Sequence, residues 1–191
     1  MLATDNTTAL DQFLVLCCAE IQRRADIAER SPDVLRQGAA AFRTALQHAS
    51  VISAANDLSA TMPVLATLDS LASSQLADAA VAVAGEIPWQ PTPRVQDSSS
   101  TVGLGRIDQV RDLGGVQCGL MLVAPGEVYP EHGHPPQEIY LPIAGNGQWR
   151  CGGATDYRQL ESDELVYNHP HDVHGVIAGV EPLLAMFILW P

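Results

Sequence analysis

The chain has 191 residues, of which 47% are hydrophobic, and its 22 acidic residues against 10 arginines and no lysine give a formal net charge of −12. This length allows one domain with an extension or two small domains, and the apolar content is sufficient for a core. The acidic balance argues against a nucleic-acid or membrane-surface partner, and the lack of lysine excludes a Schiff-base enzyme and a P-loop.

The N-terminus predicts a cytoplasmic protein. Asp5 stands where a signal peptide needs a basic region followed by an apolar run. No apolar stretch is long enough to span a membrane. The four cysteines are expected to be reduced and mostly buried, and without a Cys-x-x-Cys pair they exclude a zinc ribbon.

The first part of the chain predicts helices. Apolar residues recur at helical spacing from Thr8 to His48, with a break at Ser31-Pro32-Asp33. The face expected to be buried in the first helix consists of Leu10, Phe13, Leu14, Cys17 and Ile21.

A third helix is expected over Thr67–Ala84, ending at Gly85. Residues 1–86 therefore form a helical N-terminal extension with no catalytic grouping, and His48 is expected at the surface or at a helix end. The extension is expected either to cover one end of the following domain or to form a homodimer contact.

The composition changes at Ile87. The proline-rich run Ile87–Arg94 can form neither a helix nor a central strand, so residues 87–101 are interpreted as an extended strap with a polar loop at 97–101. From Val102 onward, short strand-like runs alternate with turns, which favours an antiparallel sandwich or barrel. The expected strands are Gln117–Ala124, Gln137–Ile143, Gly147–Cys151, Glu164–Tyr167, Gly175–Ile177 and Leu183–Trp190.

Five of the six histidines lie between positions 132 and 174. Because alternate side chains of an extended segment share a face, His132 and His134 point toward one volume. Glu138 and Tyr140 are also even-numbered, so their side chains are expected on the same face. Imidazoles and a carboxylate are ligands for a divalent first-row metal ion, with positions left open for substrate.

One more histidine could come from the segment 168–174. His174 begins an apolar strand and therefore suits an inward-facing ligand best, while His169 and His171 are its rivals.

The same residues resemble the cupin superfamily. The members of its first motif, spaced G-x5-H-x-H-x3-E-x6-G, are Gly126, His132, His134, Glu138 and Gly145. The second motif is represented by Pro170, Asp172 and His174, one residue tighter than the usual pattern, with Ala178 where asparagine is often found. The resemblance implies a small antiparallel cupin β-barrel over residues 102–191 that holds one metal ion.

A narrower resemblance concerns residues 132–140, His-Gly-His-Pro-Pro-Gln-Glu-Ile-Tyr, and the small-residue turn after them. This segment resembles the cupin-class dimethylsulfoniopropionate (DMSP) lyases of the DddQ type, which are similar in length and carry a helical extension before the barrel. Gln137 stands at a position where many members of this family carry a second acidic residue. The resemblance implies a metal-dependent carbon–sulfur lyase that cleaves zwitterionic DMSP to dimethyl sulfide and acrylate.

The resemblance also implies roles for particular residues. The metal ligands it implies are His134, Glu138, Tyr140 and His174, and the substrate contacts are Tyr129, His132 and Trp190. The ion would be Zn, Fe, Mn, Co or Ni, among which the ligand types do not decide.

The β-elimination needs a base and a group that stabilises negative charge next to the carboxylate. Tyr140, as a tyrosinate beside or on the metal, is the expected base, and Tyr129 is the alternative. The sulfonium needs aromatic faces, which Trp190 and Tyr129 could supply. Trp149 and Tyr167 are further candidates for this surface, although packing in the barrel is the favoured interpretation for both.

Two other functions fit a cupin. One is an iron-dependent dioxygenase, and the other is a non-catalytic module that binds a small ligand. Tyr140 favours the lyase, because neither alternative needs a phenol two residues after the glutamate.

Overall fold

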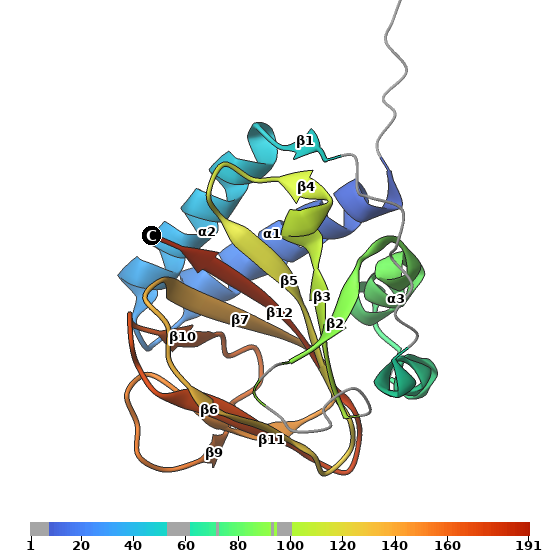
Figure 1. Ribbon diagram of the computed structural model, residues 1–191. Helices are drawn as coiled ribbons and strands as arrows, with labels where there is room; N and C mark the ends of the chain where they lie inside the picture. Colours follow the sequence, from blue (N-terminus) through green and yellow to red (C-terminus); the bar gives the residue numbers. More distant parts are fainter. Residues whose placement is uncertain (1–7, 53–61, 72, 93, 95–100) are drawn as a thin grey trace, which may run out of the picture.

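The computed structural model describes residues 8–52, 62–71, 73–92, 94 and 101–191, and Figure 1 shows helices packed against antiparallel sheets. The first two helices are confirmed as α1 (Ala9–Ile27) and α2 (Pro32–Gln47). Thr8 and Asp11 form a capping box at the start of α1, and Pro32 occupies the first turn of α2. The apolar face expected for α1 is buried.

The prediction of a third helix as one continuous element is wrong. The chain instead forms the 3-10 helix η1 (Pro63–Ser70) and then the shorter α3 (Gln75–Val83), followed by η2 (Ala84–Glu86). The Ser74 side chain accepts a hydrogen bond from the Ala77 backbone N–H, so it starts a new helix where the periodicity indicated continuation. No helix in the described ranges is long and apolar enough to cross a membrane.

The larger sheet has six antiparallel strands. Their order is β10 (Val166–Asn168), β7 (Gln137–Ala144), β12 (Leu183–Trp190), β5 (Gln117–Val123), β3 (Val102–Arg106) and β2 (Trp89–Pro91). The start of the strap thus becomes the edge strand β2, a position in which a proline is tolerated. Most of the expected 97–101 loop lies outside the described residues.

The other described strands form two smaller sheets. Four strands run in the order β6 (Val128–His132), β11 (His174–Ala178), β8 (Gly147–Arg150) and β9 (Arg158–Gln159). A separate pair joins β1 (Ser50–Val51) to β4 (Arg111–Asp112), which follows the 3-10 helix η4 (Ile107–Gln109).

The expected closed barrel is therefore only partly right. Among the described strands, hydrogen bonding leaves the four- and six-stranded sheets separate. Pro91 in the edge strand β2 and Pro130 in the edge strand β6 have no N–H to donate, so neither edge offers a complete ladder for closure. The two sheets face each other across an apolar interior that includes Met121, Trp149 and Val176.

The helices cover the other face of the six-stranded sheet. Alternate side chains of β12 point to opposite faces of the sheet. Leu184, Met186 and Ile188 pack in one core with the helices. Ala185 and Phe187 face the second sheet. A Cβ added at Gly38 of α2 would lie 2.7 Å from Trp190, so the small residue permits close approach of helix and sheet. The division into 1–86, 87–101 and 102–191 stays a prediction.

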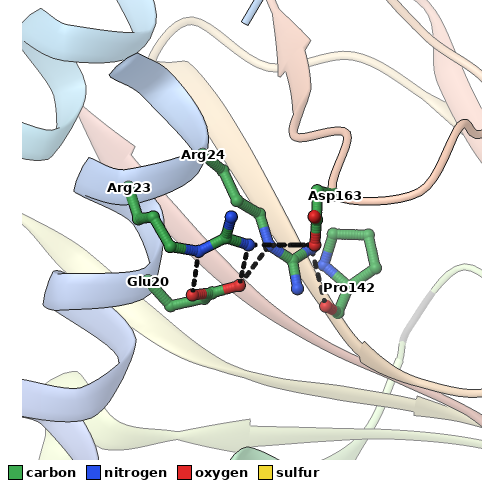
Figure 2. A network of polar contacts seen from close by, with 5 residues as sticks. All are labelled: Glu20, Arg23, Arg24, Pro142 and Asp163. Atoms are coloured by element: carbon green, nitrogen blue, oxygen red, sulfur yellow. Dashed lines mark hydrogen bonds and ion pairs between the residues drawn. The ribbon is translucent and has the colours of Figure 1, made fainter. Parts of the chain in front are cut away.

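A polar network also ties α1 to the strands (Figure 2). The Arg23 guanidinium lies 2.8 Å from Glu20 and 2.9 Å from Asp163, in the segment between β9 and β10. Arg24 donates to the Pro142 carbonyl of β7 at 3.2 Å. The helical extension is thus joined to β7 and to the segment between β9 and β10 by directional contacts as well as by apolar packing. All four cysteines are free, as expected.

Candidate metal centre and adjoining cavity

A cavity of about 290 Å³ opens beside the histidines. It is lined by residues of the strap and of both sheets, namely Arg94, Leu104, Arg106, Gln117, Tyr129, His132, His134, Pro136, Glu138, Tyr140, Phe187 and Leu189. The size suits a small molecule, and the lining combines apolar side chains with a few polar groups.

Three histidines converge at the inner end of this site. His132 ends β6, His134 follows it, and His174 begins β11 directly opposite His132 in the strand register. One ring nitrogen of each lies within 4.8 Å of the others. Antiparallel pairing of β6 and β11 thus brings together residues far apart in sequence.

The hydrogen bonds of these histidines leave their Nε2 atoms available. The Nδ1 atoms of His132, His134 and His174 lie 2.8, 3.1 and 2.8 Å from the backbone carbonyls of Pro130, Pro136 and Asp172. A carbonyl only accepts, so each Nδ1 carries a proton and each Nε2 keeps its lone pair. The Nε2 atoms of His134 and His174 are buried without a hydrogen-bond partner, as metal ligands would be.

Glu138 supplies a carboxylate to the same group. The side chain is only 3% exposed, and its Oε2 lies 3.3 Å from His134 Nε2 and 3.1 Å from His174 Nε2. Asn168 of β10 donates to this Oε2 at 3.1 Å. Burial would raise the pKa of Glu138, but the contacts with the two imidazoles outweigh burial and hold the pKa at about 2.

The histidines differ in their readiness to take a proton. Burial, and then the charge of His174, lowers the pKa of His132 to about 4, so its imidazole is neutral near neutral pH. The carboxylate of Glu138, 3.3 Å from Nε2, raises the pKa of His134 against the opposing effect of burial. A divalent ion at this group would take the place of that proton. The donor set of imidazoles and carboxylate fits a first-row divalent metal.

Both predicted tyrosines line the cavity. Tyr140 follows Glu138 on the same face of β7 and is 3% exposed. Burial and then the charge of Glu138 raise the pKa of Tyr140 well above 10. Burial also raises the pKa of Tyr129, against the opposing effect of Arg94.

The rival histidines stand apart from this group. His169 is exposed and its Nδ1 lies 3.2 Å from the Tyr167 hydroxyl, while His171 is exposed with a positive φ of 66°. His174 is the member of the 168–174 segment that joins His132 and His134.

The structure does not bring Trp190 to the cavity. Trp190 pairs with Gln137 on the helix-facing side of the sheet and packs in the core shared with the helices. Phe187 and Leu189 pair with Tyr140 and Glu138, and these two line the cavity instead. Residues directly opposite each other on neighbouring strands share a face of the sheet. The partners of Tyr140 and Glu138 on β12 therefore had to face the cavity as well, and these partners are the odd-numbered Phe187 and Leu189.

Arg94 and Arg106 are cavity residues that the sequence interpretation missed. Arg94 lies in the strap and Arg106 at the end of β3, and neither position carries a pattern that indicates a binding site. Trp149 packs between the two sheets and Tyr167 packs on the helix side, so the structure places both in cores.

Residues 35–185 of this chain match the family model described as dimethylsulfoniopropionate lyase. The structure is similar to that of DMSP lyase DddQ from Ruegeria pomeroyi DSS-3, with a TM-score of 0.67 and 16% identity, covering 98% of this chain and 93% of that one. No curated protein sequence matches significantly.

Two further structures are similar. One, described as DMSP lyases RdDddP and RnDddQII, has a TM-score of 0.60 and 19% identity, covering 95% of this chain and 94% of that one. A cupin 2 conserved barrel domain protein from Rhodopseudomonas palustris has a TM-score of 0.44 and 15% identity, covering 54% of this chain and 70% of that one. At these identities the two full-length similarities establish a shared fold.

Proposed function

This chain belongs to the dimethylsulfoniopropionate lyase family, and we propose that it cleaves DMSP to dimethyl sulfide and acrylate in the cavity between its sheets. The observation that carries this proposal is the group of three imidazole nitrogens within 4.8 Å of one another, with the carboxylate of Glu138 and the phenol of Tyr140 beside them. This group offers a metal site next to a base.

We propose that His132, His134, His174 and Glu138 hold one divalent transition metal ion. His132 thereby becomes a ligand in this proposal, because its Nδ1 also bonds to a backbone carbonyl and one of its ring nitrogens lies within 4.8 Å of those of the other two. A bound Zn, Fe, Mn, Co or Ni ion supplies Lewis-acid polarisation of the substrate carboxylate. Tyr140 then acts from beside the ligands, through its contact with Glu138.

The reaction needs one proton transfer and one bond cleavage. The Tyr140 phenolate takes the proton from the carbon next to the substrate carboxylate. The electron pair forms the new carbon–carbon double bond, the carbon–sulfur bond breaks, and its pair leaves on sulfur as dimethyl sulfide. The remaining fragment is acrylate. Because burial raises the pKa of Tyr140, formation of the phenolate depends on positive charge at the adjoining ligands.

The sulfonium end has no hydrogen-bond donor, so shape and ring faces must hold it. The Phe187 ring and the Leu189 side chain line the cavity and offer such surfaces. In this proposal Phe187 takes the role that the sequence had suggested for Trp190.

The test measures headspace dimethyl sulfide and dissolved acrylate from purified protein given DMSP. Protein stripped with a chelator should be inactive, and reloading with individual divalent ions should restore gas release. Tyr140→Phe should lose on the order of 100- to 10,000-fold in rate, the range of general-base contributions. Tyr157→Phe, at a half-buried tyrosine that contacts Glu131, is the matched control and should retain activity.

The outcomes are separable. A larger loss in Tyr129→Phe than in Tyr140→Phe would assign the base to Tyr129. Activity under anaerobic conditions would exclude the dioxygenase alternative. Folded, metal-bound protein that releases no dimethyl sulfide with any of these ions would refute the proposed function.

A further inference from the structure

Arg94 brings a positive charge to the mouth of the cavity. Its Nη1 donates a 2.9 Å hydrogen bond to the Tyr129 hydroxyl, and its Cζ lies 5.9 Å from the centre of the Tyr129 ring. The Tyr129 ring centre in turn lies 4.7 Å from that of His132. One side chain therefore separates the guanidinium from the histidine group.

The second cavity arginine is already neutralised. Arg106 makes two parallel contacts to Asp108, at 2.8 and 2.5 Å, in the fork geometry typical of arginine–carboxylate pairs. Arg94 forms no ion pair with any carboxylate in the ranges that the structure describes, and Glu138 is engaged by the imidazoles. Of the two arginines that line the cavity, Arg94 is thus the one whose charge no described carboxylate neutralises, and a bound anion can use it.

Other residues that line the cavity are apolar. Leu104, Phe187 and Leu189 carry no formal charge. A zwitterion with a carboxylate at one end and a sulfonium at the other fits this asymmetry in one orientation. The reverse orientation would place the sulfonium against the Arg94 guanidinium, which like-charge repulsion disfavours.

We propose that Arg94 binds the substrate carboxylate, fixes the orientation of the sulfonium compound, and selects carboxylate-bearing substrates over sulfonium cations without one. This inference rests on the proposed function for the identity of the substrate. Because negative charge grows on this carboxylate as the neighbouring proton leaves, the Arg94 contacts should be stronger in the transition state than in the ground state. Removing Arg94 should therefore raise KM and also lower kcat.

The experiment compares wild-type protein with Arg94→Gln and Arg94→Lys, all loaded with the same metal ion. Calorimetric titration with acrylate reports the carboxylate subsite, and titration with trimethylsulfonium reports the cation surface. Arg94→Gln should weaken acrylate binding and raise KM for DMSP roughly 10- to 100-fold, the range for hydrogen bonds to charged groups. Arg94→Lys should lose less, because it keeps the charge but not the fork.

The comparison variant is Arg106→Gln, which removes a guanidinium from the same cavity where Asp108 already neutralises it. A smaller effect on acrylate binding in Arg106→Gln than in Arg94→Gln, with trimethylsulfonium binding retained in Arg94→Gln, would support the proposal. Unchanged acrylate binding in Arg94→Gln would overturn it, as would an equal loss of acrylate and trimethylsulfonium binding. Because acrylate binding is measured directly, the proposal is testable even if wild-type protein fails to cleave DMSP.

Discussion

At the scale of single residues, Glu138 accounts for much of the chemistry. It is a buried carboxylate that receives a hydrogen bond from Asn168 and lies between two imidazoles. A buried charge without partners would be strongly destabilising, so this arrangement requires the surrounding positive or polarised groups. The same arrangement gives a metal ion its anionic ligand.

Replacing Glu138 by glutamine should therefore lower metal affinity on the order of 100-fold or more, because the shape is kept while the ligand charge is lost. A competition titration against a chromogenic chelator measures this affinity. Glu131→Gln is the control, since Glu131 is an exposed carboxylate of β6 that pairs with Arg150. Wild-type metal affinity in Glu138→Gln would remove Glu138 from the ligand set.

Sequence spacing grouped His132, His134 and Glu138, and the structure brings their side chains together, although they come from β6, the segment after it and β7 rather than from one extended strand. It could not find Arg94, because only the tertiary fold brings this residue within 2.9 Å of the Tyr129 hydroxyl, 35 positions further along the chain. It also misplaced Trp190, since the strand Leu183–Trp190 is apolar on both faces and carries no alternation to read.

At the scale of elements, strand packing leaves little space at Gly119 of β5. A Cβ there would lie 2.0 Å from the Gly105 carbonyl oxygen of the neighbouring strand β3 and 2.6 Å from the Phe187 ring. Movement of a side chain cannot relieve the first contact, because the Gly105 oxygen belongs to the backbone.

Gly119→Ala should accordingly destabilise the protein by about 2 kcal/mol or more, the cost of overpacking a well-filled interior. Urea unfolding followed by tryptophan fluorescence measures the free energy of unfolding. Gly85→Ala is the matched control, since a Cβ at Gly85 has no atom within 4 Å, and it should change stability by less than about 0.5 kcal/mol. Equal effects at the two glycines would contradict this account.

Helix α1 carries an acid-sensitive contact. The hydrogen bond from Arg23 lowers the pKa of Glu20 to about 2, against the opposing effect of burial and with further help from Arg24. Because the folded pKa lies below the ordinary 4.5, ionised Glu20 stabilises the fold above pH 4.5. That stabilisation is lost as the pH falls toward 2.

Glu20→Gln should cost about 1 kcal/mol at pH 7 after allowance for the partial exposure of the network, and the difference from wild type should vanish near pH 2. Unfolding curves at a series of pH values between 7 and 2 test this. Asp33→Asn, in the exposed pair with Arg36, should show little effect. A pH-independent difference for Glu20→Gln would mean that lost packing, not charge, causes the destabilisation.

At the scale of the whole molecule, the helices and the six-stranded sheet share one apolar core. Ile139, Leu141 and Leu184 of the sheet belong to the same buried cluster as Phe13 and Phe42 of the helices. Burial of a side chain of this size contributes roughly 1.5–3 kcal/mol. The homodimer expected as one role of the helical extension stays a prediction, and in this structure the extension covers a sheet face.

A chain that starts at residue 53 should therefore aggregate, because removing α1 and α2 would expose this sheet face to water. Size-exclusion chromatography and binding of an apolar dye measure the result. A monodisperse truncated protein with a wild-type unfolding transition would show that the sheet does not need the helices.

Strand β12 has a consequence for how relatives of this protein can diverge. Phe187 and Leu189 face the cavity, while Ile188 and Trp190 face the helices. Substitutions at the odd positions can change which substrates are accepted without loosening the helix contact, and substitutions at the even positions act on folding alone. Directed evolution of substrate range should accumulate changes at 187 and 189 while leaving 188 and 190 intact.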